Sequence, residues 1–232
     1  MPRAVAGADG CPGGWIVVRD TGGVVAAELV ADAAGLVAVA HEVEALGVDI
    51  PMGLADHGPR ACDVAARAFL GAGRASSVFP APVRAALDAT EYAEACTRSL
   101  AACGKKLTLQ TWHIVARIRD MDTALRAARR MAERIHEVHP ESSFHLWCGR
   151  AGLPPKKTAE GRTARRSLVE AQWPGAWAAT RATHPKALVR DDDLLDAFAA
   201  LWSAHRIAAG TALRLPAEVA RDAHGLPMVI QA

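Results

Sequence analysis

Apolar residues near the N-terminus alternate with glycine pairs in a pattern that predicts three strands. The apolar runs are Ala4–Asp9, Trp15–Val18 and Val24–Val30, and the pairs Gly13-Gly14 and Gly22-Gly23 separate them. Glycine pairs between apolar runs are turn signals, and tight turns join antiparallel neighbours. The first thirty residues are therefore expected to form an antiparallel meander whose first strand ends at a carboxylate.

The next segment predicts a helix followed by a fourth strand. Ala33–Leu46 is rich in alanine, with apolar spacing suited to a helix, and Gly47 is a plausible stop. Val48–Pro51 then reads as a short buried strand that contains Asp49. In a β-β-β-α-β order with the fourth strand parallel to the first, Asp9 and Asp49 end two neighbouring strands.

The middle of the chain has a looser pattern. We expect a helix around Arg60–Phe69 and a long ordered loop over residues 71–82, which are rich in Gly, Ser and Pro. Over Thr108–Ile135, apolar residues recur every three or four positions and the other face carries arginines, which predicts one long helix.

The last part of the chain predicts one strand candidate, two helices and a tail. Glu137–Glu141 is a short strand candidate that contains a proline, and a strand would place Glu137, His139 and Glu141 on one face. Thr158 is a candidate cap for a helix that runs toward Trp173, and Asp191–Asp193 open a final helix with an apolar stripe. In the tail, Met228–Ile230 could form one strand.

These elements predict an α/β fold with a mixed sheet, three antiparallel strands followed by parallel ones, flanked by helices. The 232 residues fit a single domain, 1–232, with a helical and loop insertion at about 52–136.

With 51% hydrophobic and 22% charged residues, the composition excludes a disordered chain. Five cysteines without a C-x-x-C pair argue against a disulfide framework and a four-cysteine zinc site, and favour the cytoplasm. No apolar run is long enough to predict a membrane span.

The small net charge of +2 hides an uneven distribution. Residues 98–166 hold 15 Lys and Arg against six Asp and Glu, whereas the remainder of the chain holds 12 against 19. A basic segment on an acidic body suggests a polyanionic partner, although solvated basic helices would give the same count.

Carboxylates are the best candidates for chemistry. Asp193 and Asp196 are three residues apart and share one face of the final helix. Asp9 and Asp49 end two predicted central strands, and Glu141 follows the last strand candidate. Such a cluster needs a counter-charge, which Mg²⁺ or Mn²⁺ bound by oxygen ligands would supply, and it could then hydrolyse phosphodiesters. Aspartates at a helix start also serve simply as caps.

Several short blocks in the chain resemble one known family. They are Gly7-Ala-Asp-Gly-Cys-Pro-Gly-Gly-Trp15, Asp49-Ile-Pro-Met-Gly-Leu54, Cys62-Asp63, Arg74-Ala-Ser-Ser-Val-Phe-Pro-Ala-Pro82, Gln110-Thr-Trp112, Glu137-Val-His-Pro-Glu141 and Asp192-Asp-Leu-Leu-Asp-Ala197. Together they resemble the signature blocks of the DUF429 family of predicted RNase H-like nucleases. The last block is also similar to the final helix of Holliday-junction resolvases. The resemblance implies metal ligands at Asp9, Asp49, Asp193 and Asp196, with Glu141 as a further catalytic candidate.

Basic and hydroxyl residues supply candidate phosphate contacts. Arg74, Ser76 and Ser77 lie in the predicted loop, and two lysine pairs, Lys105-Lys106 and Lys156-Lys157, could hold a nucleic-acid backbone. For each set an ordered turn or a solvated surface is the competing interpretation.

Three functions are compatible with these observations. The first is a metal-dependent nuclease that acts on nucleic acid with Mg²⁺ or Mn²⁺. The second is a nucleotide-binding phosphotransferase or ATPase-like protein of the same fold, because the glycine-rich Asp9–Gly14 turn resembles a phosphate-embracing hairpin. The third is a non-catalytic nucleic-acid-binding module.

Overall fold

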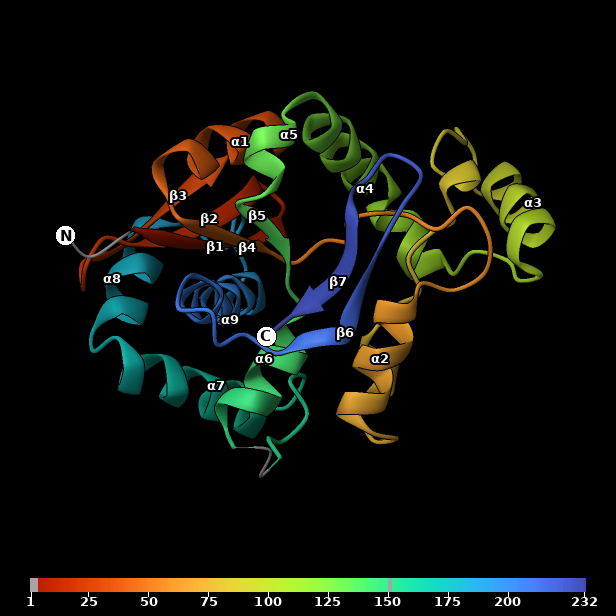
Figure 1. The fold of residues 1–232 in the computed structure, drawn as a ribbon. Helices are drawn as coiled ribbons and strands as arrows, with labels where there is room; N and C mark the ends of the chain where they lie inside the picture. Colours follow the sequence, from red (N-terminus) through yellow and green to blue (C-terminus); the bar gives the residue numbers. More distant parts are fainter. Residues whose placement is uncertain (1–3, 150–151) are drawn as a thin grey trace.

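A five-stranded mixed sheet forms the centre of the structure, a computed structural model that describes residues 4–149 and 152–232. The strand order is β3-β2-β1-β4-β5 (Figure 1). Strands β1 to β3 are antiparallel, and β4 and β5 join them in parallel. Their bounds are β1 Val5–Cys11, β2 Gly14–Asp20, β3 Val25–Val30, β4 Ala45–Val48 and β5 Ile135–Glu137. The predicted α/β class and strand directions are confirmed.

Helices cover both faces of this sheet (Figure 1). Helices α1 and α4 contribute to the core on one face, and α9 lies against the other, with α6, α7 and α8 outside it. The bounds are α1 Ala33–Glu42, α2 Ala61–Leu70, α3 Tyr92–Cys103, α4 Leu109–Ala127, α5 Arg129–Ala132, α6 Pro140–Trp147, α7 Ala159–Gln172, α8 Ala176–Thr183 and α9 Asp191–Ala208, with 3₁₀ turns at Ala75–Ser77 and Arg84–Ala86. No helix within the described residues is long and apolar enough to cross a bilayer.

Two glycines let α9 approach the sheet at backbone distance. Gly7 of β1 and Gly47 of β4 are register partners. A Cβ on Gly7 would lie 1.9 Å from the Leu201 amide nitrogen, and one on Gly47 would lie 2.7 Å from the Ala200 carbonyl oxygen. Only glycine fits at such a crossing, so this pair of glycines sets how closely α9 approaches the sheet.

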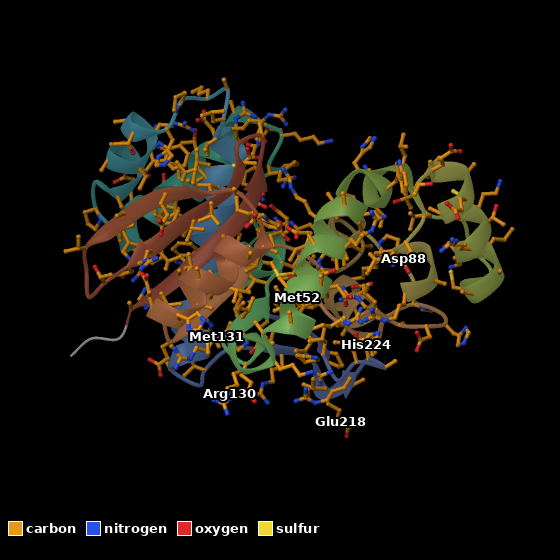
Figure 2. The ribbon with its side chains drawn as sticks, turned by 90° about the horizontal axis from the view of Figure 1, so that it is seen from above. Met52, Asp88, Arg130, Met131, Glu218 and His224 are labelled. Atoms are coloured by element: carbon orange, nitrogen blue, oxygen red, sulfur yellow. The ribbon has the colours of Figure 1, made fainter. Side chains whose placement is uncertain are left out.

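The predicted helix over Thr108–Ile135 is confirmed as far as Ala127 and is wrong beyond it. Helix α4 ends at Ala127, and Ala128 leaves helical geometry with φ −113° and ψ 55° before the single turn of α5. The break changes the direction of the chain so that Met131 packs against the core beside α1 (Figure 2). Strand β5 then begins at Ile135.

The predicted strand Glu137–Glu141 is also wrong. Strand β5 ends at Glu137, and Pro140 occupies the first turn of α6, where its fixed φ and missing N–H are tolerated. The Nδ1 atom of His139 caps this helix by accepting from the Ser142 N–H at 3.2 Å. Glu141 is therefore on a helix and does not share a strand face with Glu137.

The remaining differences lie at the edges of the fold. The first helix stops at Glu42 instead of Leu46, because Val43 turns extended and Leu46 joins β4. The predicted strand Met228–Ile230 is confirmed as part of β7 (Pro227–Gln231), which forms a hairpin with a strand that the sequence did not predict, β6 (Arg214–Arg221). Gln231 bridges to Val138 just beyond β5. Glu218 points away from the body at this hairpin (Figure 2).

Candidate metal centre

Three aspartates from three separate elements meet at the carboxyl ends of β1 and β4. Asp9 lies near the end of β1, Asp49 follows β4 directly, and Asp196 lies in the second turn of α9. The Asp49 N–H donates to the Ala8 carbonyl at 3.0 Å, which fixes the two strand ends side by side. One oxygen from each carboxylate lies within 4.8 Å of the others. Asp196 is buried, and Asp9 and Asp49 are partly buried.

The environment of these three groups raises the pKa of each carboxyl group. Burial raises the pKa of Asp49 to about 8, and the nearby Asp196 charge adds to this shift. Burial also raises the pKa of Asp9 well above its usual range, followed by the charges of Asp49 and Asp196. Burial raises the pKa of Asp196 as well, although Lys156 opposes that shift. Such mutual repulsion is relieved when a cation binds between the carboxylates.

Lys156 is the cation already present beside the group. Its Nζ lies 3.1 Å from Asp196 Oδ2, and Asp196 in turn raises the pKa of this lysine. The lysine comes from the loop between α6 and α7, 40 residues before its partner. Sequence reasoning placed Lys156 with the phosphate contacts and missed this pair.

Two of the predicted acidic site residues, the metal-ligand candidate Asp193 and the catalytic candidate Glu141, are engaged elsewhere. Asp193 is a helix cap, because its Oδ2 accepts from the Arg190 N–H at 2.9 Å. Glu141 forms a buried ion pair in which Arg165 Nη2 donates to both carboxylate oxygens at 2.8 Å. The structure thus brings Asp9, Asp49 and Asp196 together and leaves Asp193 and Glu141 outside that group.

The three aspartates line a cleft of about 660 Å³. Arg74, Ser76, Ser77 and Lys157, which the sequence suggested as phosphate contacts, line the same cleft. Arg74 donates to the Leu153 carbonyl, and Ser77 Oγ donates to the Arg74 carbonyl at 2.8 Å. Lys157 and Ser76 are exposed to solvent.

The other lysine pair does not reach this cleft. Lys105 and Lys106 are exposed in the turn between α3 and α4, and neither lines the cavity. A larger cavity of about 1180 Å³ lies elsewhere, between α5, β5 and the C-terminal hairpin, and Met52 and His224 line it (Figure 2). Within the described part of the chain, the one group of three metal-ligating side chains is the aspartate group of the smaller cleft.

A family model for proteins of unknown function, DUF429, matches residues 7–221. The chain belongs to the DUF429 family. No curated protein and no solved structure matches it.

In this DUF429 chain, a buried arginine holds the segment that follows Asp49. Arg60 Nη1 donates to Glu137 Oε2 at 2.8 Å and to the Met52 carbonyl at 2.9 Å. Glu137 Oε2 also accepts from the Met52 N–H at 2.7 Å, and Arg60 Nη2 donates to Asp63 at 2.6 Å. These bonds tie α2 and β5 to the backbone three residues after Asp49. Sequence reasoning missed Arg60, because nothing in the local pattern distinguishes it from a surface arginine.

Arg117 of α4 is a second residue that the sequence did not single out. Its Nη2 donates to the Cys11 carbonyl at 2.6 Å, and its guanidinium lies 5.8 Å from the centre of the Trp15 ring. A Cβ on Gly10 would lie 3.1 Å from Arg117 Nη1, so the arginine covers the turn next to Asp9. It lines the cleft together with the exposed ring of Phe79. The DUF429 cleft therefore combines three carboxylates with a basic and aromatic rim.

Proposed function

We propose that this protein is a metal-dependent nuclease with an RNase H-like arrangement of acids, which uses Mg²⁺ or Mn²⁺ to hydrolyse phosphodiester bonds in nucleic acid. The observation that carries the proposal is the meeting of Asp9, Asp49 and Asp196, with carboxylate oxygens within 4.8 Å of one another. Ligand oxygens around one Mg²⁺ lie roughly 3 to 4 Å apart, so small side-chain rotations would complete the set.

The chain's own residues have distinct roles in this proposal. Asp9, Asp49 and Asp196 hold the ion, which when bound lowers the pKa of a bound water and stabilises negative charge on phosphate oxygens. Arg117 and Lys157 on the cleft lining would bind neighbouring phosphates, and Phe79, which is 42% exposed, offers a ring for a base to stack on.

The phosphotransferase alternative gains no support from the hairpin that suggested it. A phosphate-binding turn needs free backbone N–H groups. Here the Gly13 N–H donates to the Leu188 carbonyl at 2.9 Å, and Pro12 has no N–H to offer. We therefore keep the nuclease as the proposed function.

The test is cleavage of a substrate panel by purified protein with EDTA, Mg²⁺ or Mn²⁺. The panel contains single-stranded DNA, duplex DNA, single-stranded RNA, an RNA–DNA hybrid and a four-way junction. We expect cleavage of at least one substrate that requires metal and that Asp9→Asn abolishes. Asp88→Asn is the matched control, because Asp88, which is labelled in Figure 2, is exposed and does not line the cleft.

The panel also separates the alternatives. Binding without cleavage, unchanged in Asp9→Asn, would favour a non-catalytic module. Cleavage that persists in both Asp9→Asn and EDTA would indicate a contaminating nuclease and contradict the proposal.

A further inference from the structure

Hydrogen bonds fix the backbone just before Lys156, whose side chain lies next to the aspartates. The Pro154 carbonyl accepts from Arg165 Nη1 at 2.9 Å, and the Pro155 carbonyl accepts from the Thr158 N–H at 3.0 Å. The loop also packs closely on the start of α7, since a Cβ on Gly161 would lie 2.1 Å from the Pro155 oxygen. Both proline carbonyls thus anchor the backbone immediately before the lysine.

Two buried glutamates near the group, Glu137 and Glu141, already have arginine partners. Glu141 is paired with Arg165 at 2.8 Å, and Glu137 is paired with Arg60 at 2.7 Å. Among the described residues, Lys156 is the one basic side chain that forms an ion pair with Asp9, Asp49 or Asp196.

Charge balance then limits what the cleft can hold. Three carboxylates carry three negative charges, and the Lys156 ammonium cancels one of them. The remaining two match one divalent ion, whereas two divalent ions beside the lysine would leave a surplus of positive charge. Repulsion between Lys156 and a second ion near Asp196 would be severe at such short distances.

We infer that the aspartate group takes a single divalent ion and that Lys156 fills the place of a second one, as a catalytic residue whose ammonium donates to a phosphate oxygen of the substrate. This inference rests on the proposed nuclease function. Lys156 and the aspartates line the same cleft, which is open to a phosphodiester.

The role requires no proton from the lysine. In the hydrolysis one water adds to phosphorus, the P–O bond to the leaving sugar oxygen breaks, and one proton of that water ends on the leaving alcohol. Lys156 stays charged throughout and stabilises the negative charge that develops on the phosphate oxygens.

The first test is a calorimetric titration with Mn²⁺ of the full-length protein. The variants are Lys156→Met, which removes the ammonium group but keeps an unbranched side chain only one atom shorter, and Lys186→Met as a matched control. Lys186 also pairs with an aspartate of α9, Asp191 at 2.8 Å, but it is 73% exposed and lies outside the cleft.

We expect one Mn²⁺ per chain in the wild type and in Lys186→Met. Lys156→Met should bind the first ion at least about tenfold more tightly, because a positive charge a few ångströms from the ion is gone. It should also take up a second ion. Two ions in the wild type, or unchanged affinity and stoichiometry in Lys156→Met, would overturn the inference.

The second test measures cleavage of whichever substrate the wild type cuts. We expect Lys156→Met to lower kcat at least about tenfold at saturating metal despite its tighter metal binding. Lys156→Arg should recover part of the loss because it keeps the charge. Faster cleavage by Lys156→Met would instead make the lysine an inhibitory competitor of the ion, which contradicts a catalytic role.

The two proposals fail in different ways. A wild type that binds no Mn²⁺ would refute both of them. A wild type that binds one ion but cuts nothing in the panel would refute the nuclease and, with it, the catalytic part of the inference, while the titration still decides the single-ion assignment.

Discussion

Substitution of Gly7 by alanine tests how the candidate site is built without touching any of its ligands. Gly7 lies two residues before Asp9 on β1, and its Cα faces the backbone of α9. An added Cβ would lie 1.9 Å from the Leu201 nitrogen and 2.4 Å from the Ala197 oxygen. Both are backbone atoms, so no side-chain rotation can relieve the contact.

The size of the effect follows from these distances. Ordinary van der Waals contact begins at 3.4 Å, so α9 must retreat by about 1.5 Å to accept the methyl group. Overpacking of this kind costs about 1–3 kcal/mol, and rigid backbone on both sides places Gly7→Ala at the upper end. For a chain of this length that corresponds to a fall in Tm of about 6–12 °C.

The retreat of α9 also moves Asp196 away from Asp9 and Asp49, because Asp196 directly precedes Ala197 on the same helix. Metal affinity should fall about 10–100-fold, the range seen when groups that orient metal ligands are removed. Calorimetry with Mn²⁺ measures the affinity, and a thermal melt in EDTA measures the stability. Gly73→Ala is the control, because a Cβ there meets nothing within 4 Å.

The outcome that would refute this reasoning is specific. If Gly7→Ala melted and bound Mn²⁺ like the wild type, α9 would not cross β1 at this distance. A lower Tm with unchanged Mn²⁺ affinity would mean that the distance between α9 and the sheet does not determine the position of Asp196.

Three further predictions concern the groups around the aspartates. Glu141→Gln should lower stability by about 3 kcal/mol, because it leaves the buried Arg165 charge uncompensated. Its Mn²⁺ stoichiometry should not change, and loss of the ion would show that Glu141 is a metal ligand. Arg60→Met should lower the free energy of unfolding, measured in a denaturant melt, by about 3–5 kcal/mol, because the buried Glu137 carboxylate loses its ion-pair partner. A change near zero would contradict the role of Arg60 in holding this segment. The raised pKa of Asp49, about 8, means that its proton is bound more tightly in the folded state. Metal-free protein should therefore lose stability as the pH rises from about 4 to about 8, and Asp49→Asn should flatten that dependence; an equally steep wild-type and variant profile would contradict it.

Two of the three aspartates could be predicted because strand topology alone brings them together. Asp9 and Asp49 end apolar runs, and a parallel pairing of their strands puts both at one edge of the sheet. The choice between Asp193 and Asp196 could not be made in this way, since both lie on one face of α9 by spacing. The rotation of the helix decides it, and the contact of Ala197 and Leu201 with Gly7 sets that rotation.

Other parts of the site depend on long-range contacts that no local pattern reports. Pro140 weakened the prediction of a strand, but it gave no sign that α6 begins there and turns Glu141 toward Arg165. Lys156 is separated from Asp196 by two helices, so its sequence context shows only a basic connector. The break at Ala128 is likewise set by the core that Met131 must reach, not by a helix-breaking residue.

The uneven pairing of acids in this region is itself informative. Glu137 and Glu141 are buried and each is bound by an arginine, which is how a protein usually compensates a buried charge. Asp9 and Asp49 are partly buried, and the structure records no ion pair for either within the described residues. Since the nearby Glu137 and Glu141 are each paired with an arginine, the lack of an ion-pair partner is specific to Asp9 and Asp49. A ligand that carries two positive charges would remove the cost, and this argues for a binding role of the aspartates rather than a purely structural one.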